Sequence, residues 1–283
     1  MKKKINLTAR DHLVLEHLKN FEVSTKRVLR EKFFDGRKMA AVVSMQRRLD
    51  GRGVGYIYGT KIPGTRTLYF RLTRQGADYL GVEINTQPMK DTKLFGLIGR
   101  LYFFHRVPAG IDLSVCTTSM LLKFINNKDL ESGKIRPPRV DFYIAQNKIG
   151  GDKDSGLALG LILPDLNSTV RRVSDRILSH SENFIERGWF TDVMKAGRFE
   201  WTILTGHRPK VEELQMAVTR KLRRRLAALY FKHSLDLSEL PPIRVKVEVI
   251  PELANVRLLK KKKKATRDPS SKLPGPRKNN GRR

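Results

Sequence analysis

The chain has 283 residues, and its 57 lysines and arginines against 28 acidic residues give a formal net charge of +29. Such an excess predicts a polyanionic partner, of which nucleic acid is the commonest. No apolar run is long enough to span a bilayer, and a single cysteine excludes both an intramolecular disulfide and a cysteine-rich zinc site. No secretory signal is visible at the start, so a cytoplasmic location is expected.

The first third of the chain carries the signals of three helices. Thr8 and Asp11 form a capping pattern before the first helix, and Ser24 or Thr25 can cap the second. The third is predicted over residues 37–52. Its apolar residues recur at three- and four-residue steps, so they share one face: Met39, Val42, Met45 and Leu49.

The opposite face of this third helix is small at its centre and cationic at its ends, with Arg37, Ala40, Ser44 and Arg47. A helix that enters a DNA groove needs this combination, because its backbone must come close while its ends reach phosphates or base edges. The alternative is a solvated amphipathic helix whose arginines face water.

Residues 56–61 and 66–72 are rich in strand-forming residues and enclose an Ile-Pro-Gly-Thr turn, which predicts a hairpin. Lys61 and Arg66 fall at its tip and Arg71 at its base. Three helices and a hairpin in this order predict a winged helix-turn-helix over residues 1–82 that binds DNA; the alternative is a winged helix used for protein contacts. The expected DNA contacts are Arg37, Lys38, Ala40, Ser44, Arg47, Arg48, Arg52, Lys61 and Arg66.

Residues 83–91 are expected to form a linker to an α/β mixed-sheet domain over residues 92–256, so the chain as a whole is α+β. Helices are predicted at 92–106 (sandwiched between layers), 113–125 (with a strand beginning at 115–118 as an alternative), 168–188 and 210–230. Strands are predicted at 140–145, 157–163, 199–205 and 244–250. Residues 126–138 are expected to form a loop. Residues 257–283, with 12 basic residues and one acid, are predicted to be a disordered basic arm on nucleic acid that includes Lys260, Lys261, Lys262, Lys263 and Lys264.

The second domain also raises the question of catalysis. A metal-dependent nuclease needs clustered carboxylates for Mg²⁺ and a lysine that orients water. Asp141 and Asp165 can converge at one end of the sheet, but no acid-x-lysine step completes the site, and Asp165 is equally suited to lead into the helix at Ser168. We therefore assign no catalytic residue, metal or cofactor, with Mg²⁺ expected only if the nuclease alternative holds.

Two arginine clusters lie on predicted helices of the second domain. Arg171 and Arg172 belong to one helix, and Arg223 and Arg224 to the other. Each cluster is either a solvated stripe over a packed apolar face or part of a second surface that contacts phosphates.

The segments LTARDHLVLEHL, QRRLDGRGVGYIY and LYFRLTRQGADYLG resemble the winged-helix start of the replication-relaxation family of plasmids and other mobile elements. The element order of the second domain is similar to the degenerate PD-(D/E)xK-type fold attached to that winged helix. Asp141 in RVDFYI stands where the family has its strand aspartate, and Asp165 stands where its acidic strand end would be. The resemblance implies DNA binding in the replication, mobilisation or regulation of a mobile element.

The expected partner is double-stranded DNA, together with other replication, mobilisation or transposition proteins or a second copy of the chain. Two rival hypotheses stay open. One is a PD-(D/E)xK-type nuclease or DNA-joining component. The other is an adaptor or structural subunit of a larger nucleoprotein complex that docks through the apolar segments at 92–125. Composition alone does not separate DNA from RNA.

Overall fold

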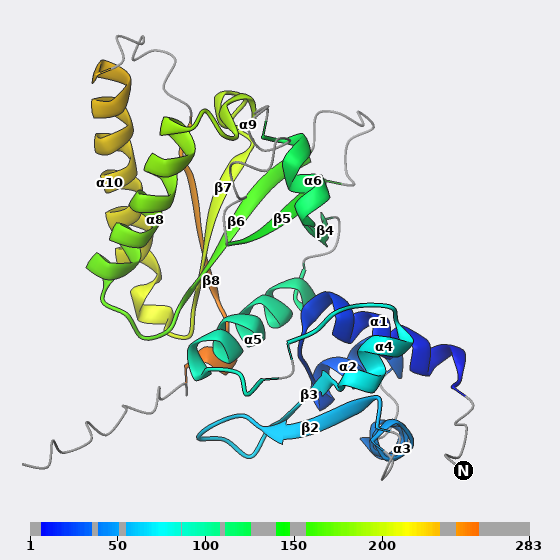
Figure 1. Ribbon diagram of the computed structural model, residues 1–283. Helices are drawn as coiled ribbons and strands as arrows, with labels where there is room; N and C mark the ends of the chain where they lie inside the picture. The colour runs from blue at the N-terminus through cyan, green and yellow to red at the C-terminus, as the bar shows by residue number, and fades with distance from the viewer. Residues whose placement is uncertain are drawn as a thin grey trace, which may run out of the picture.

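The computed structural model describes residues 7–35, 39–50, 55–85, 87–107, 111–125, 140–147, 157–232 and 242–254. The chain is α+β, with two sheets and a helical N-terminal part (Figure 1). None of the helices in these ranges is both long and apolar enough to cross a bilayer.

In its described residues, the N-terminal unit has four helices and a small antiparallel sheet with strand order β1-β3-β2. Val14, Leu29, Val42 and Phe70, from four of its elements, are fully buried in one core. The elements are α1 (Ala9–Phe21), β1 (Ser24–Thr25), α2 (Lys26–Phe33), α3 (Met39–Leu49), β2 (Ile57–Lys61), β3 (Leu68–Leu72) and α4 (Arg74–Tyr79).

Short-range sequence signals account for the ends of these helices. The predicted capping box of α1 is confirmed: Asp11 N donates to Thr8 Oγ1 at 3.2 Å, and Thr8 N donates to Asp11 Oδ2 at 3.0 Å. Thr25 caps α2 and Thr73 caps α4. Gly81 follows α4 with a φ of +63°, a conformation that glycine adopts without strain.

The C-terminal unit is built on a five-stranded mixed sheet with the order β4-β5-β6-β7-β8. Strands β4, β5 and β6 are antiparallel, whereas β6, β7 and β8 are parallel, because helical crossovers connect β6 to β7 and β7 to β8. The elements are α5 (Asp91–His105), β4 (Ile111–Val115), α6 (Thr118–Lys123), β5 (Asp141–Asn147), β6 (Leu157–Asp165), α8 (Val170–Glu186), α9 (Thr191–Lys195), β7 (Phe199–Thr205), η1 (Arg208–Lys210), α10 (Val211–Lys232), β8 (Arg244–Val249) and η3 (Pro251–Leu253).

The two faces of the large sheet are covered by different helices. Helices α8 and α10 cover one face, where Leu161, Ile177 and Leu222 are buried together. Helix α5 lies against the other face and also contacts the N-terminal unit (Figure 1). Its buried residues pack on both sides, so the prediction of a sandwiched helix at 92–106 is confirmed.

The structure corrects two details of the second domain. The segment predicted as a helix at 113–125 contains the end of the edge strand β4, which stops at Val115, and only α6 is helical, so both the long helix and the alternative of a strand beginning at 115–118 are wrong. The short helix α9 was not predicted. Strand β4 depends on pairing with β5, a non-local interaction that local periodicity does not reveal. The expected loop at 126–138 and basic arm at 257–283 lie outside the described residues.

Candidate nucleic-acid interface

Helix α3 presents the predicted face to solvent. Val42, Met45 and Leu49 are buried, as the apolar periodicity predicted. Ala40, Ser44 and Arg47 are exposed on the other side of the helix. Met39, expected on the apolar face, is 38% exposed. Arg37, Lys38 and Arg52, which were expected to extend the cationic face at both ends, lie outside the described residues.

Arg48 has a partner inside the protein, which the sequence did not suggest. Its Nε donates to Asp11 Oδ2 at 2.9 Å and its Nη2 to Asp11 Oδ1 at 2.5 Å. Burial opposes ionisation of Asp11, but the hydrogen bonds from Arg48 and Thr8 outweigh it, so the pKa of this carboxyl lies below its ordinary value. The side chain expected to contact phosphate thus joins α3 to α1 and fixes the orientation of the exposed face.

The β2–β3 hairpin starts after α3 and runs from it toward α5, and its residues Ile62 and Tyr69 are buried in the cluster that includes residues of α5 (Figure 1). Its turn is ordered by hydrogen bonds: Thr65 Oγ1 donates to the carbonyl of Ile62 at 3.1 Å and accepts from Thr67 N at 3.1 Å. Gly64 takes the left-handed conformation that the turn needs, with a φ of +74°. Lys61 and Arg66 flank this turn and are both exposed, as predicted for the tip.

The third basic residue expected on the hairpin is not on its surface. Arg71 is only 7% exposed, and its guanidinium donates to the carbonyls of Asn85 at 2.8 Å and Gln87 at 3.4 Å. The expected linker is therefore fixed to β3 rather than loose. Arg71 is a structural residue because its donors satisfy backbone carbonyls of this segment.

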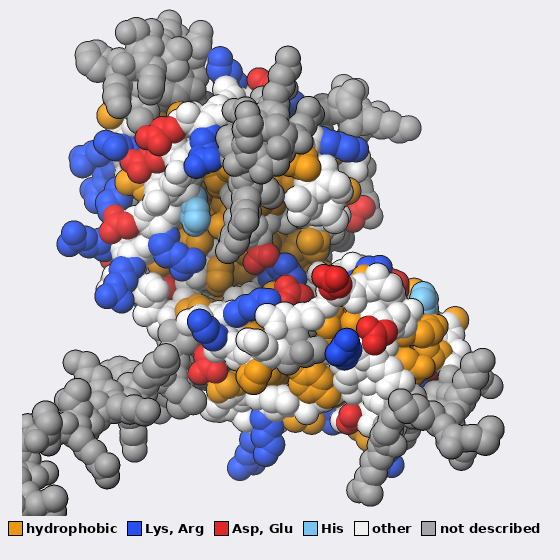
Figure 2. All heavy atoms as spheres, viewed as in Figure 1, with side chains coloured by type: hydrophobic (Ala, Val, Ile, Leu, Met, Phe, Trp, Pro, Cys, Tyr) orange, Lys and Arg blue, Asp and Glu red, His pale blue; other side chains and the backbone are white. Residues whose placement is uncertain are grey.

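Basic residues also gather on the C-terminal unit. Figure 2 shows lysine and arginine side chains over α8 and α10, with acidic side chains among them. The side chain of Arg171 is 88% exposed and lies 3.8 Å from Asp175, which Lys221 of α10 also approaches at 2.5 Å. Arg172, Arg223 and Arg224 are exposed. The predicted arginine clusters therefore exist as surface features, and part of the charge on α8 is already paired with α10.

The structure separates the two carboxylates of the nuclease hypothesis. Asp141 is opposite Ile162 in the β5–β6 register, so it shares the α5 face of the sheet, whereas Asp165 is three residues further along β6 and lies on the opposite face. Both are at the same end of the sheet, but they do not converge. Asp141 binds Arg100 at 2.7 Å.

Asp165 has the structural role that the sequence offered as an alternative. Its side chain is fully buried, accepts a hydrogen bond from Ser168 N at 2.8 Å, and lies 3.6 Å from Lys210 Nζ. It thus leads β6 into α8. Within the described ranges no three histidine, cysteine or acidic side chains come close enough to hold a metal ion.

One buried polar cluster was missed by sequence reasoning. Tyr143 of β5 is 2% exposed, and its hydroxyl donates to Glu200 and lies 2.7 Å from Thr202 Oγ1, both on β7. The ring reaches across β6 because Gly160 has no side chain; a Cβ there would lie 2.0 Å from Tyr143 Cζ. Burial, and then Glu200, raise the pKa of Tyr143 well above its ordinary value. A lone glycine in an apolar strand was the available signal.

Comparison of the chain with protein families, with curated proteins and with solved structures gives no match.

Proposed function

We propose that the chain binds double-stranded DNA through a winged helix made of α1, α2, α3 and the three-stranded sheet. The order helix, strand, helix, helix, strand, strand with sheet order β1-β3-β2 supports this assignment. In this mode α3 enters the major groove and the β2–β3 hairpin contacts the flanking backbone or minor groove.

The observation that carries the proposal is the free face of α3. Ala40 and Ser44 allow the helix backbone to come close to base edges, and Arg47 supplies a cation on the same side. Lys61 and Arg66 at the hairpin tip add two further phosphate contacts. Arg48 positions α3 through Asp11 and is not among the proposed contacts.

The C-terminal unit supports the same proposal in a non-catalytic role. The element order α5, β4, α6, β5, β6, α8, α9 and β7, with β6 and β7 parallel, supports the likeness to the degenerate PD-(D/E)xK-type fold that the sequence resembles. On that resemblance we place the protein in the replication, mobilisation or regulation of a mobile element. The separation of Asp141 from Asp165 gives the nuclease alternative no support.

The test begins with selection of bound duplexes from a random DNA library by the full chain. Affinity for the selected site and for unrelated duplex DNA is then measured at about 150 mM salt, where loose electrostatic binding is weak. Replacing Arg47 with alanine is expected to reduce specific binding by about 1–3 kcal/mol. Arg208→Ala removes the same charge from an exposed position on η1 and is the matched control. Equal affinity of the Arg47→Ala variant and the wild type for the selected site contradicts the proposal.

A further inference from the structure

The outer face of α10 carries charges of both signs in a fixed order along the helix. Glu212 and Glu213 stand in its first turn, and Arg220, Arg223 and Arg224 follow two to three turns later. All five are exposed, and none of them has an ion pair within the described part of the chain. By contrast, Lys221 and Arg225 of the same helix are paired with Asp175 and Glu182 of α8.

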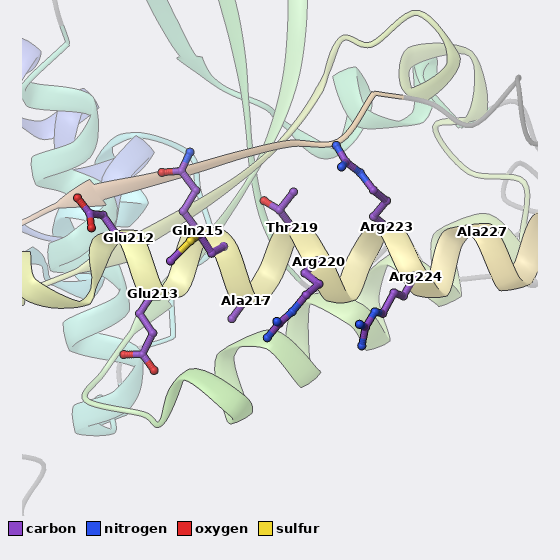
Figure 3. A pocket seen from close by; sticks show the side chains of 10 residues that line it. Glu212, Glu213, Gln215, Ala217, Thr219, Arg220, Arg223, Arg224 and Ala227 are labelled. Atoms are coloured by element: carbon purple, nitrogen blue, oxygen red, sulfur yellow. The ribbon is translucent and has the colours of Figure 1, made fainter.

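These five charges form two rows (Figure 3). Glu213, Arg220 and Arg224 point to one side of the helix in this view, and Glu212 and Arg223 point to the other. Each row therefore begins with an acid and ends with arginine. Figure 1 shows that α10 lies at the outer edge of the molecule, with α8 on one side of it.

An exposed methionine lies between the rows. Met216 is 67% exposed, more than any other large hydrophobic side chain in the described ranges. Ala217 lies on the side of Glu213 and Arg220, and Thr219 on the side of Glu212 and Arg223, so each row also carries a small side chain that allows another helix to approach closely (Figure 3). An exposed methionine between two rows of unpaired charges is the composition of a helix-packing surface, with an apolar centre and a charged rim.

We propose that a second copy of this chain packs on this face, with the two α10 helices antiparallel about a twofold axis near Ala217. A twofold interface brings the same surface of both copies together, with the two helices running in opposite directions. The start of each charged row in one copy therefore faces the end of the same row in the other copy. The antiparallel arrangement thus places the glutamates of one copy opposite the arginines of the other, at both ends of the contact. Met216 then lies near the axis, facing the partner helix.

The helix dipole does not explain this arrangement. It favours acids in the first turn, which accounts for Glu212 and Glu213, but its effect is confined to the terminal turns. Arg220, Arg223 and Arg224 lie in the middle of a 22-residue helix. DNA is the competing occupant for these arginines, but a phosphate backbone would repel Glu212 and Glu213 on the same face.

Charge reversal tests the proposal on the full chain without DNA. One variant carries Glu212→Arg with Glu213→Arg, and the other carries Arg223→Glu with Arg224→Glu. Each alone brings like charges together at both ends, so the dimer is expected to weaken by about tenfold or more. An equimolar mixture restores opposite charges at both ends and is expected to form a heterodimer of wild-type affinity.

Sedimentation velocity over a concentration series, at moderate and high salt, measures these states. Arg172→Glu and Glu186→Arg, at exposed positions on α8, are the matched controls and leave dimerisation unchanged. Circular dichroism shows whether each variant folds. Heterodimer formation in the mixture shows that both variants can still dimerise. A wild-type chain that stays monomeric, or a dimer that survives both reversals, overturns the proposal. So does a monomer whose DNA affinity alone responds to Arg223→Glu and Arg224→Glu, because DNA would then occupy this face.

Discussion

Arg48 on α3 and Asp11 on α1 form a bidentate ion pair in which the Asp11 side chain is fully buried and the Arg48 side chain is 38% exposed. This pair sets the position of the proposed recognition helix. Asp11 also accepts from the backbone of Thr8, so one carboxylate both caps α1 and anchors α3.

Replacing Arg48 with alanine is expected to lower the free energy of unfolding by about 2 kcal/mol, because a buried carboxylate loses its main partner. The folded-state pKa of Asp11 is below the ordinary value of 3.8. Its contribution is therefore present above that pH and is lost as the pH falls through the folded-state pKa. Urea unfolding followed by circular dichroism at neutral pH measures the first effect. A double-mutant cycle with Asp11→Asn isolates the pair; additive losses would show that the two side chains are not coupled.

The hairpin tip is expected to contribute salt-dependent affinity. If Lys61 and Arg66 each neutralise one phosphate, replacing both with alanine makes the negative slope of log K against log salt shallower by about 2. The measurement is fluorescence anisotropy with duplex DNA over a salt series. The pair Lys123→Ala and Arg208→Ala, exposed on the C-terminal unit, removes the same charge elsewhere. An equal change of slope in both double variants would show that only net charge matters.

His17 predicts a pH dependence of stability. It is 5% exposed, and burial, then Lys32 and His105, lower its pKa from 6.5 to about 3. The folded protein keeps His17 neutral where the unfolded chain takes up a proton, so its contribution is complete above pH 6.5 and declines as the pH falls toward 3. Through His17 alone, the free energy of unfolding is expected to fall by about 2–3 kcal/mol between about pH 7 and pH 4.5.

Urea unfolding at the two pH values tests this expectation with His17→Gln, which keeps a polar group next to Ser24 Oγ, 3.0 Å from His17 Nε2. The variant should show a shallower pH dependence than the wild type. His12→Gln, at an exposed position on the same helix, is the control. An unchanged pH dependence in the His17 variant would mean that the ring is accessible to protons in the folded state.

Gly160 is expected to be intolerant of a side chain. Gly160→Ala would place a methyl group against the ring of Tyr143, at a cost of about 1–3 kcal/mol in the free energy of unfolding. The fluorescence of Trp201, buried in the core beside this strand, follows the unfolding transition. If the contact is the cause, the loss in Gly160→Ala combined with Tyr143→Ala is smaller than the sum of the single losses. If the two losses are additive, the destabilisation by Gly160→Ala does not come from contact with Tyr143.

The sequence by itself determined the features that depend on neighbouring residues. The capping box at Thr8 and Asp11, the hairpin with Lys61 and Arg66 at its tip, and the exposure of Ala40, Ser44 and Arg47 all follow from periodicity and turn chemistry. These signals act over a few residues, so they can be read from the chain directly.

Tertiary structure alone decided which distant groups meet. It paired Arg48 with Asp11, buried Arg71 against the backbone at Asn85, and placed Asp141 and Asp165 on opposite faces of the sheet. Sequence reasoning placed these two carboxylates at the correct end of the sheet and missed their faces, because the strand register fixes the face and depends on pairing across the chain. Whether a charged residue stays exposed or forms an ion pair likewise depends on which distant residues the fold places next to it.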